Sequence, residues 1–299
     1  MSLLTSPSKR TSNINIPSPR HITGSGSTFL SLANARYRHN DGMTMKMAFS
    51  LVELSIVLVI LGLLTGGILA GQSLIRASEL RSVSADYSRY ITAVQSFRDR
   101  YFAIPGDMPN ATRFWGKDNT NCSAHTGTAT TGGTCNGNGD GSLNSVATAG
   151  TTGEYYQFWK HLALAGLIEG SYTGLSGSGG GEHSIIGTNV PAAKLSNAGW
   201  SVYNIANYPG NTEWFAFDYQ NMFTFGTQNA TSITYFSVLK PEEAWNIDTK
   251  LDDGKPGSGK IMSLWNYGCT DATGFSNLTA NYALNTTTIV CRLVFPKSF

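Results

Sequence analysis

An apolar run from Phe49 to Gly71 constrains this chain more than any other feature. The run is 23 residues long, and its only charged residue is Glu53. About 20 apolar residues are enough for a helix that crosses a lipid bilayer. A carboxylate at bilayer depth costs about 2.5 to 3.5 kcal/mol. The sequence therefore predicts a membrane-length helix whose single acid needs a partner.

The segment before Phe49 and the segment from Phe49 onward carry net charges of opposite sign. Residues 1–48 carry six Lys or Arg and one acid, whereas residues 49–299 carry 15 bases and 18 acids. Basic residues on the amino side of a span keep that side in the cytoplasm. We therefore expect a cytoplasmic amino terminus and a large domain across the membrane. The acidic balance of that domain gives no electrostatic reason to bind nucleic acid.

Two simpler explanations of the run fit less well. A secretory signal has a shorter apolar region of about 7 to 15 residues and a small-residue cleavage site. Ile68-Leu69-Ala70 matches such a site poorly. An uncleaved anchor fits the length and the flanks, but it leaves Glu53 unexplained.

Residues 1–48 are interpreted as a leader that is removed. Residues 1–40 are rich in Ser, Thr, Asn, Pro and Arg and lack apolar periodicity, which indicates disorder. An organellar transit peptide and sequence upstream of the true start both fit this composition. We favour the second interpretation, because a start at Met43 leaves Met-Thr-Met-Lys-Met-Ala, a short basic leader.

The residues from Lys46 to Leu64 resemble the amino-terminal signal of type IV pilins and of type II secretion pseudopilins. The matching features are a basic leader, a small residue before the cut, Phe as first mature residue, Glu as fifth and Gly62 as fourteenth. The resemblance implies that a prepilin peptidase cuts between Ala48 and Phe49 and methylates the new amine. Ala48 departs from the Gly usual in the family, and the helix-bending Pro common there is missing.

This processing would give Glu53 a partner. Cleavage creates an ammonium on Phe49, and Glu53 of a neighbouring copy can neutralise it inside an apolar bundle. Removing one member of a buried ion pair costs about 3 to 5 kcal/mol, because the other charge stays buried and unpaired. Phe49 and Glu53 are thus the predicted assembly residues.

A second helical pattern follows the run. Apolar residues recur every three or four positions, which places them on one face of an amphipathic helix. They are Leu80, Val83, Tyr87, Ile91, Val94, Phe97 and Tyr101. The pattern predicts one helix from Phe49 to about Tyr101, with residues 49–71 as the membrane and assembly half and 72–103 as the amphipathic half. It should end before Pro105.

The remaining segment, residues 104–299, is expected to form a turn-rich α+β head. A short helix is predicted from Glu154 to about Ile168, and strands are predicted from Trp200 onward. The strand candidates are Glu213–Tyr219, Met222–Phe225, Ile233–Leu239 and Thr287–Phe295. A long helix packed on an antiparallel sheet is also the fold that the pilin resemblance implies.

Four cysteines lie on the side expected to be exported, where disulfides form. Three pairings are possible. We favour Cys122–Cys135 and Cys269–Cys291, because each pair encloses a polar, turn-rich segment. A zinc site with His125 is the alternative, but the paired CxxC spacing of structural zinc is missing.

Two loops are candidate calcium sites. Asn136, Asn138 and Asp140 alternate before a glycine as calcium ligands do, although Ala147 stands where a calcium loop has its bidentate Glu. The simpler interpretation is an Asx turn. Residues 246–256 resemble a loop of pseudopilin-like proteins in which relatives bind calcium, so Asp248, Asp252 and Asp253 are further candidates. Their simpler interpretation is a solvated turn.

No HExxH, P-loop or GxSxG motif occurs, so we expect a protein without catalytic activity. All six tryptophans follow Phe102 and are expected mainly in the core, although an exposed subset would suit a binding role. The resemblance implies a minor pseudopilin of a type II secretion system. Such a protein works in the bacterial inner membrane and then in a filament, with other subunits and an assembly platform as partners. An adhesive membrane-anchored protein, a specialised type IV pilin and an enzymatic head are the alternatives.

Overall fold

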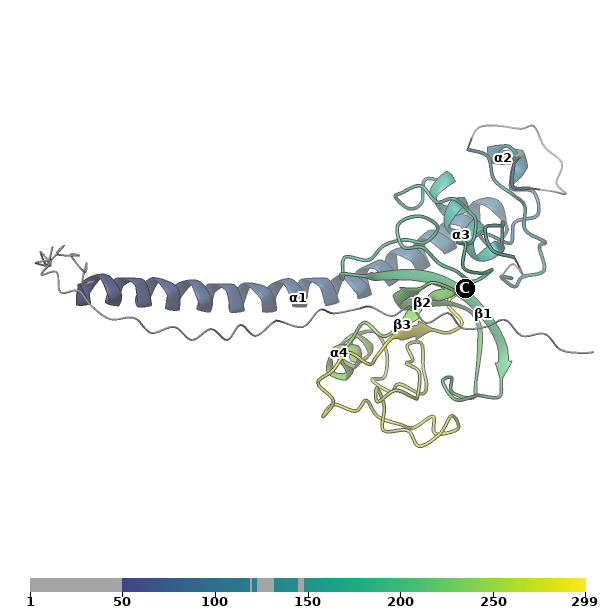
Figure 1. Cartoon of the computed structure of the whole chain (residues 1–299). Helices are drawn as coiled ribbons and strands as arrows, with labels where there is room; N and C mark the ends of the chain where they lie inside the picture. The colour runs from purple at the N-terminus through teal and green to yellow at the C-terminus, as the bar shows by residue number, and fades with distance from the viewer. Residues whose placement is uncertain (1–49, 119, 123–131, 145–147) are drawn as a thin grey trace, which may run out of the picture. The chain divides into compact units, whose positions relative to one another are not determined.

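A computed structural model describes residues 50–118, 120–122, 132–144 and 148–299 (Figure 1). The chain divides into two units, Met1–Ser55 and Ile56–Phe299, and the boundary lies inside the first helix. The predicted start at Met43 and the predicted cleavage between Ala48 and Phe49 lie outside the described residues.

Helix α1 spans Leu51–Tyr101 and confirms the predicted long helix. It continues through Gly62, Gly66, Gly67 and Gly71 without a break. The helix ends as predicted before Pro105, where Phe102 adopts a left-handed backbone conformation with φ of 53°. By length and composition alone, α1 is a helix that could cross a membrane.

The head of the second unit contains a four-stranded antiparallel sheet, so the fold is α+β (Figure 1). Strand β1 (Ala198–Tyr208) pairs along one edge of β2 (Phe217–Asn229). Strands β3 (Ser232–Phe236) and β4 (Leu293–Phe295) pair with different stretches of β2. Because a strand has only two edges, β3 and β4 share the second one.

The sheet separates two apolar clusters, as the alternation of side chains along a strand requires. Phe223 and Phe225 of β2 join the first cluster, which includes the packed face of α1. Met222 and Val294 belong to the second cluster. Tyr87 of α1 stacks on Phe295 at a centroid distance of 4.4 Å, so aromatic contacts fix the helix to the sheet.

Three short helices follow α1 in the described part of the chain. Helix α2 spans Thr112–Trp115, α3 spans Glu154–Leu164 and α4 spans Pro241–Leu251. The predicted extension of α3 to Ile168 is wrong. Gly166 takes a φ of 71°, and the Leu167 amide donates to the Leu162 carbonyl at 3.0 Å, which closes the helix in a Schellman turn.

The predicted strands are corrected in three places. Two strands were expected, at Glu213–Tyr219 and at Met222–Phe225. The pairing of β1 with β2 continues through Gln220 and Asn221, so the paired residues of both segments belong to the single strand β2. The first residues of the former segment lie outside β2, because Asn211 caps a turn there through the amides of Glu213 and Trp214. The strands predicted at residues 233–239 and 287–295 are observed as the shorter strands β3 and β4.

Candidate assembly surface and metal loops

The first half of α1 carries a continuous exposed apolar surface. Its larger apolar side chains are between half and almost nine-tenths exposed: Leu51, Val52, Leu54, Ile56, Val57, Leu58, Val59, Ile60, Leu61, Leu63, Leu64, Ile68, Leu69, Leu74 and Ile75. A monomeric soluble protein rarely exposes an apolar patch of this extent. This surface therefore requires a covering of lipid or protein.

Glu53 lies at the amino end of this surface and has a local partner that the sequence analysis missed. Its Oε2 accepts a hydrogen bond from the Ser50 amide at 2.9 Å. Ser50 Oγ in turn accepts one from the Val52 amide at 3.3 Å. Ser-x-x-Glu is the sequence of a capping box, and the Glu53 bond is that of the box, whereas Ser50 Oγ takes the second helical amide in place of the third. The signal was visible in the sequence as Ser50 three residues before Glu53.

Arg76 marks the point at which α1 begins to pack on the head. Its Nε and Nη2 atoms donate to the two carboxylate oxygens of Glu243 in α4, at 2.6 and 2.7 Å. Burial raises the pKa of Glu243, but the bonds from Arg76 and from the Lys240 amide outweigh it and lower the pKa. Beyond Arg76, α1 buries Val83, Tyr90 and Phe97.

The two predicted disulfides are confirmed. Cys122–Cys135 joins α-carbons 5.5 Å apart, and Cys269–Cys291 joins α-carbons 5.0 Å apart. Both cysteines of the alternative zinc site are therefore consumed in a covalent bond, and His125 lies outside the described residues. The second disulfide ties the segment before β4 to the loop that follows Leu264.

The loop with Asn136, Asn138 and Asp140 is organised by hydrogen bonds of its own. Asn136 Oδ1 accepts from the Thr112 amide at 2.8 Å. Asn138 Nδ2 donates to Asp140 Oδ2 at 2.8 Å, and Asp140 Oδ1 accepts from the Ser142 amide at 2.8 Å. This is the pattern of Asx turns. Calcium binding at this loop stays a prediction, and Ala147 lies outside the described residues.

Two carboxylates that the sequence did not single out hold the same loop. Asp107 is buried and accepts from the amides of Gly139 and Gly141 at 2.6 and 2.8 Å. Glu154, at the start of α3, accepts from the amides of Asn138 and Asn144 at 2.9 and 2.8 Å. Burial raises the pKa of Glu154, although these two bonds oppose the rise. The contacts span long sequence separations, so no local pattern could have revealed them.

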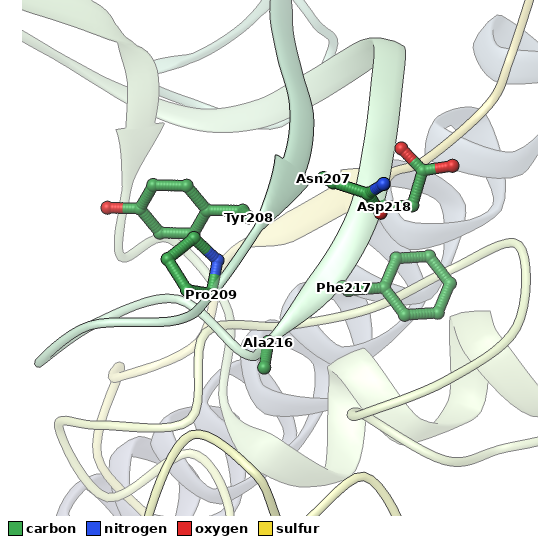
Figure 2. Close-up of a pocket in the computed structure, with 6 residues that line it drawn as sticks. All are labelled: Asn207, Tyr208, Pro209, Ala216, Phe217 and Asp218. Carbon is green, nitrogen blue, oxygen red and sulfur yellow. The ribbon is translucent and has the colours of Figure 1, made fainter.

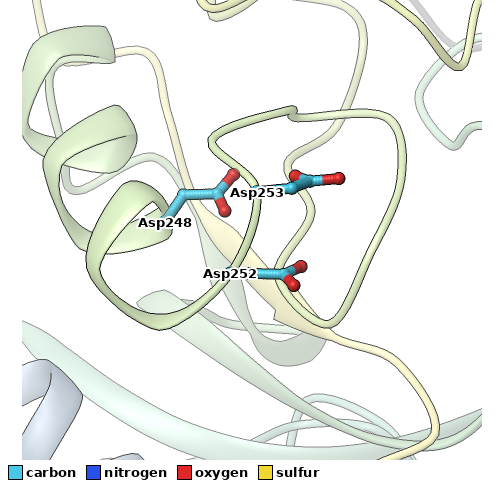
Figure 3. A group of neighbouring side chains, drawn as sticks. All are labelled: Asp248, Asp252 and Asp253. Atoms are coloured by element: carbon cyan, nitrogen blue, oxygen red, sulfur yellow. The ribbon is translucent and has the colours of Figure 1, made fainter.

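Asp248, Asp252 and Asp253 come together at the end of α4 (Figure 3). One oxygen of each lies within 4.8 Å of the others. The predicted turn at residues 246–256 is wrong in its first half, because Asn246–Leu251 is the end of α4. Pro at the first helical position and Ala244 and Ile247 on the buried face explain the helix.

The three aspartates have different surroundings. Asp248 is fully buried and accepts from Tyr282 Oη at 2.8 Å and from the Gly254 amide at 3.1 Å. Burial raises the pKa of Asp248 to about 7, against the lowering effect of these two bonds. Asp252 accepts from the amides of Lys260 and Ile261. The group offers oxygen ligands of the kind that calcium takes, and its occupancy stays a prediction.

A surface depression lies where β1 ends and β2 begins, lined by Asn207, Tyr208, Pro209, Ala216, Phe217 and Asp218 (Figure 2). Asp218 there is paired with Lys297 at 3.1 Å. The depression therefore presents a neutralised carboxylate together with two aromatic rings.

The prediction that most tryptophans lie in the core is confirmed in part. Trp159, Trp200 and Trp214 are buried, whereas Trp245 is 37% exposed.

No family model, curated protein or solved structure matches this chain. The pilin resemblance consequently rests on the residues from Lys46 to Leu64 and on the arrangement of α1.

Proposed function

We propose that this chain is a structural subunit of a pilus-like filament, of the minor pseudopilin class that serves type II secretion. The observation that carries the proposal is the exposed apolar first half of α1, which begins at Leu51 and ends where Arg76 docks on the head. A subunit built in this way has one half of a helix for its neighbours and one half for its own head.

In this proposal the helix first spans the bacterial inner membrane, with its amino end in the cytoplasm. Prepilin peptidase removes the leader before Phe49, and an assembly platform moves the chain into a filament with other pilin or pseudopilin subunits. Glu53 of one copy then faces the amine of another. The ion pair forms in an apolar bundle, where an unpaired charge would be costly, so it fixes the register of the incoming subunit.

The glycines of α1 support close packing between such helices. A Cβ placed on Gly62, Gly66, Gly67 or Gly71 would meet no atom within 4 Å. The head therefore does not need small residues at these positions. Small residues let helix backbones approach closely when helices associate in a membrane.

Processing is tested by the mass of the amino-terminal peptide of the mature chain. We expect a peptide that begins at Phe49 and carries one methyl group on its amine. A mature chain that begins at any other residue contradicts the processing step.

The role of Glu53 is tested with variants that separate charge from capping. Glu53→Gln keeps an oxygen that can accept from the Ser50 amide but removes the charge. Ser50→Ala removes the hydroxyl that caps Val52 and keeps the charge. We expect Glu53→Gln to lose co-purification with a second, tagged copy of the chain, and Ser50→Ala to retain it.

The capping box gives a competing explanation with a different result. If Glu53 only caps the helix, Glu53→Gln behaves like the unmodified chain, and Ser50→Ala costs about 1 kcal/mol of helix stability. Retained co-purification in Glu53→Gln, with normal membrane insertion, would therefore remove the proposed assembly role.

A further inference from the structure

Arg292 is a buried cation with an unfilled hydrogen-bonding edge. It stands between Cys291 and β4, and its exposed fraction is 5%. Within the described part of the chain, no group forms a hydrogen bond with its Nε or Nη2 atom. Among the described residues, Arg292 also forms no ion pair within 4.0 Å. A buried charged donor without a partner is costly, so this arrangement needs an explanation.

Two tyrosines enclose the guanidinium. Its Cζ atom lies 4.8 Å from the ring centroid of Tyr267 and 5.5 Å from that of Tyr235. Both phenols point to Glu213, at 2.7 Å from Tyr267 and 3.5 Å from Tyr235. The aromatic faces stabilise the cation. The carboxylate of Glu213 accepts hydrogen bonds from these hydroxyl groups, and its charge acts on Arg292 from beyond ion-pair distance.

The molecule shows elsewhere what this edge of an arginine binds. Arg76 uses the same two atoms, Nε and Nη2, to hold both oxygens of the Glu243 carboxylate. A guanidinium presents these two donors side by side, at the spacing of the two oxygens of a carboxylate. The same edge of Arg292 offers the same two donors, and no carboxylate of the described residues is paired with it.

We propose that Arg292, Tyr235 and Tyr267 form a binding site for a carboxylate group, which the Nε and Nη2 atoms of Arg292 receive side by side. The carboxylate comes either from a small free anion or from a second copy of the chain. The site lies in the head and is independent of the proposed role of Glu53 in α1.

Tyr267 is the exposed member of this site. Its side chain is 51% exposed and covers the guanidinium. The neighbouring residues of its loop are tied down, because Trp265 Nε1 donates to the Asn211 carbonyl and Asn266 Nδ2 to the Thr212 carbonyl, both at 2.8 Å. The disulfide Cys269–Cys291 links this loop to the residue before Arg292. In this proposal, a rotation of the Tyr267 side chain gives the carboxylate access to Arg292.

The test follows the NMR signal of the Arg292 Nε–H group in the full chain, which is labelled with ¹⁵N-arginine and held in detergent micelles. The signal is assigned by its loss in Arg292→Lys. Sodium acetate is titrated into a dilute sample against sodium chloride at equal ionic strength. We expect a saturable shift with acetate alone, and half-saturation at a several-fold lower acetate concentration in Tyr267→Ala.

A second arm distinguishes the source of the carboxylate. A shift that grows with protein concentration, without acetate, identifies a carboxylate from a second copy, whereas a shift only with acetate identifies a free anion. Glu213→Gln is the matched control for an internal counter-ion, and it should leave the acetate shift in place. If neither arm gives a shift in the unmodified chain or in Tyr267→Ala, or if chloride gives the same shift, the proposal is wrong.

Discussion

The two halves of α1 have the same secondary structure and opposite surroundings. Up to Ile75 the large apolar side chains of the helix are exposed, and from Arg76 the helix pairs with α4 and buries Val83, Tyr90 and Phe97. The second half owes its place to the head of its own chain. Among the described residues nothing packs on the first half in this way, and we propose that lipid or other subunits cover its apolar surface.

The comparison is tested first by truncating one large side chain in each half. Phe97→Ala removes a fully buried ring that lies 4.6 Å from Tyr101, and we expect a loss of about 3 to 5 kcal/mol in the free energy of unfolding of the head. Leu63→Ala, at a side chain that is 73% exposed, should change it by less than about 0.5 kcal/mol. Denaturant titration of the full chain in detergent measures both. Equal losses would show that the halves do not differ.

Removing a disulfide tests how far the packed half depends on a closed head. Cys269→Ser with Cys291→Ser opens a loop of 22 residues, and we expect a loss of about 3 kcal/mol. The exposed half of α1 should keep its helical signal after this change, because no disulfide partner lies on it. Thermal unfolding followed by circular dichroism checks both statements.

Acid should weaken the packed half through His161, which stacks against Phe97. His161 Nδ1 accepts from the Gly106 amide at 2.9 Å, and Nε2 faces the Cys135 carbonyl at 3.1 Å, so Nε2 carries the single proton of a neutral ring. Burial lowers the pKa of His161 from 6.5 to about 4. The unfolded chain therefore binds the extra proton first, and stability falls as the pH drops from 6.5 toward 4.

The titration of Asp248 changes the stability of the fold in the opposite direction over an overlapping pH range. Its folded pKa of about 7 exceeds the usual 3.8, so the folded chain keeps the proton longer and stability falls as the pH rises from about 4 to 7. In an Asp248→Asn background we expect the His161 effect to dominate, at about 1.6 kcal/mol lost between pH 6.5 and 5. If NMR shows that the His161 ring in the folded chain titrates near pH 6.5, the predicted acid effect of His161 is wrong.

The smallest effect is expected at the boundary between the halves. Glu243→Gln removes the carboxylate that receives Arg76, and we expect a loss of about 1 kcal/mol because Arg76 is about a third exposed. The loss should shrink at acid pH, since the lowered pKa of Glu243 makes its contribution present at neutral pH and absent once it is protonated. Glu242→Gln, at a neighbouring exposed position, is the control.

Sequence alone predicted the parts of the fold that depend on nearby residues. The spacing from Leu80 to Tyr101 is a local property, so α1 was predicted almost to its last residue. The disulfides followed because each closes a short loop. The register that pairs Trp200 with Phe225 was beyond reach, because it depends on the packing of α1 against the completed sheet.

In the candidate sites, too, only the residues with a local signal could be predicted from the sequence. Glu53 was found because a lone acid in an apolar run stands out, and its capping bond to Ser50 was overlooked in favour of an external partner. Asp107 bonds to the amide of Gly139 over a separation of 32 residues, and the edge of Arg292 is defined by Tyr235 and Tyr267 from other parts of the chain. Contacts of this range are set by the tertiary fold, and no motif announces them.

Photo-crosslinking in a living cell tests the external environment of α1 most directly. A photoreactive residue replaces Leu63 in the exposed half, and in a matched chain it replaces Ser88, an exposed position in the packed half. We predict that Leu63 forms adducts with a second copy or another filament subunit, that Glu53→Gln abolishes these adducts, and that Ser88 gives fewer. Adducts of Leu63 with lipid alone, unchanged by Glu53→Gln, would contradict the account and leave α1 as a plain membrane anchor.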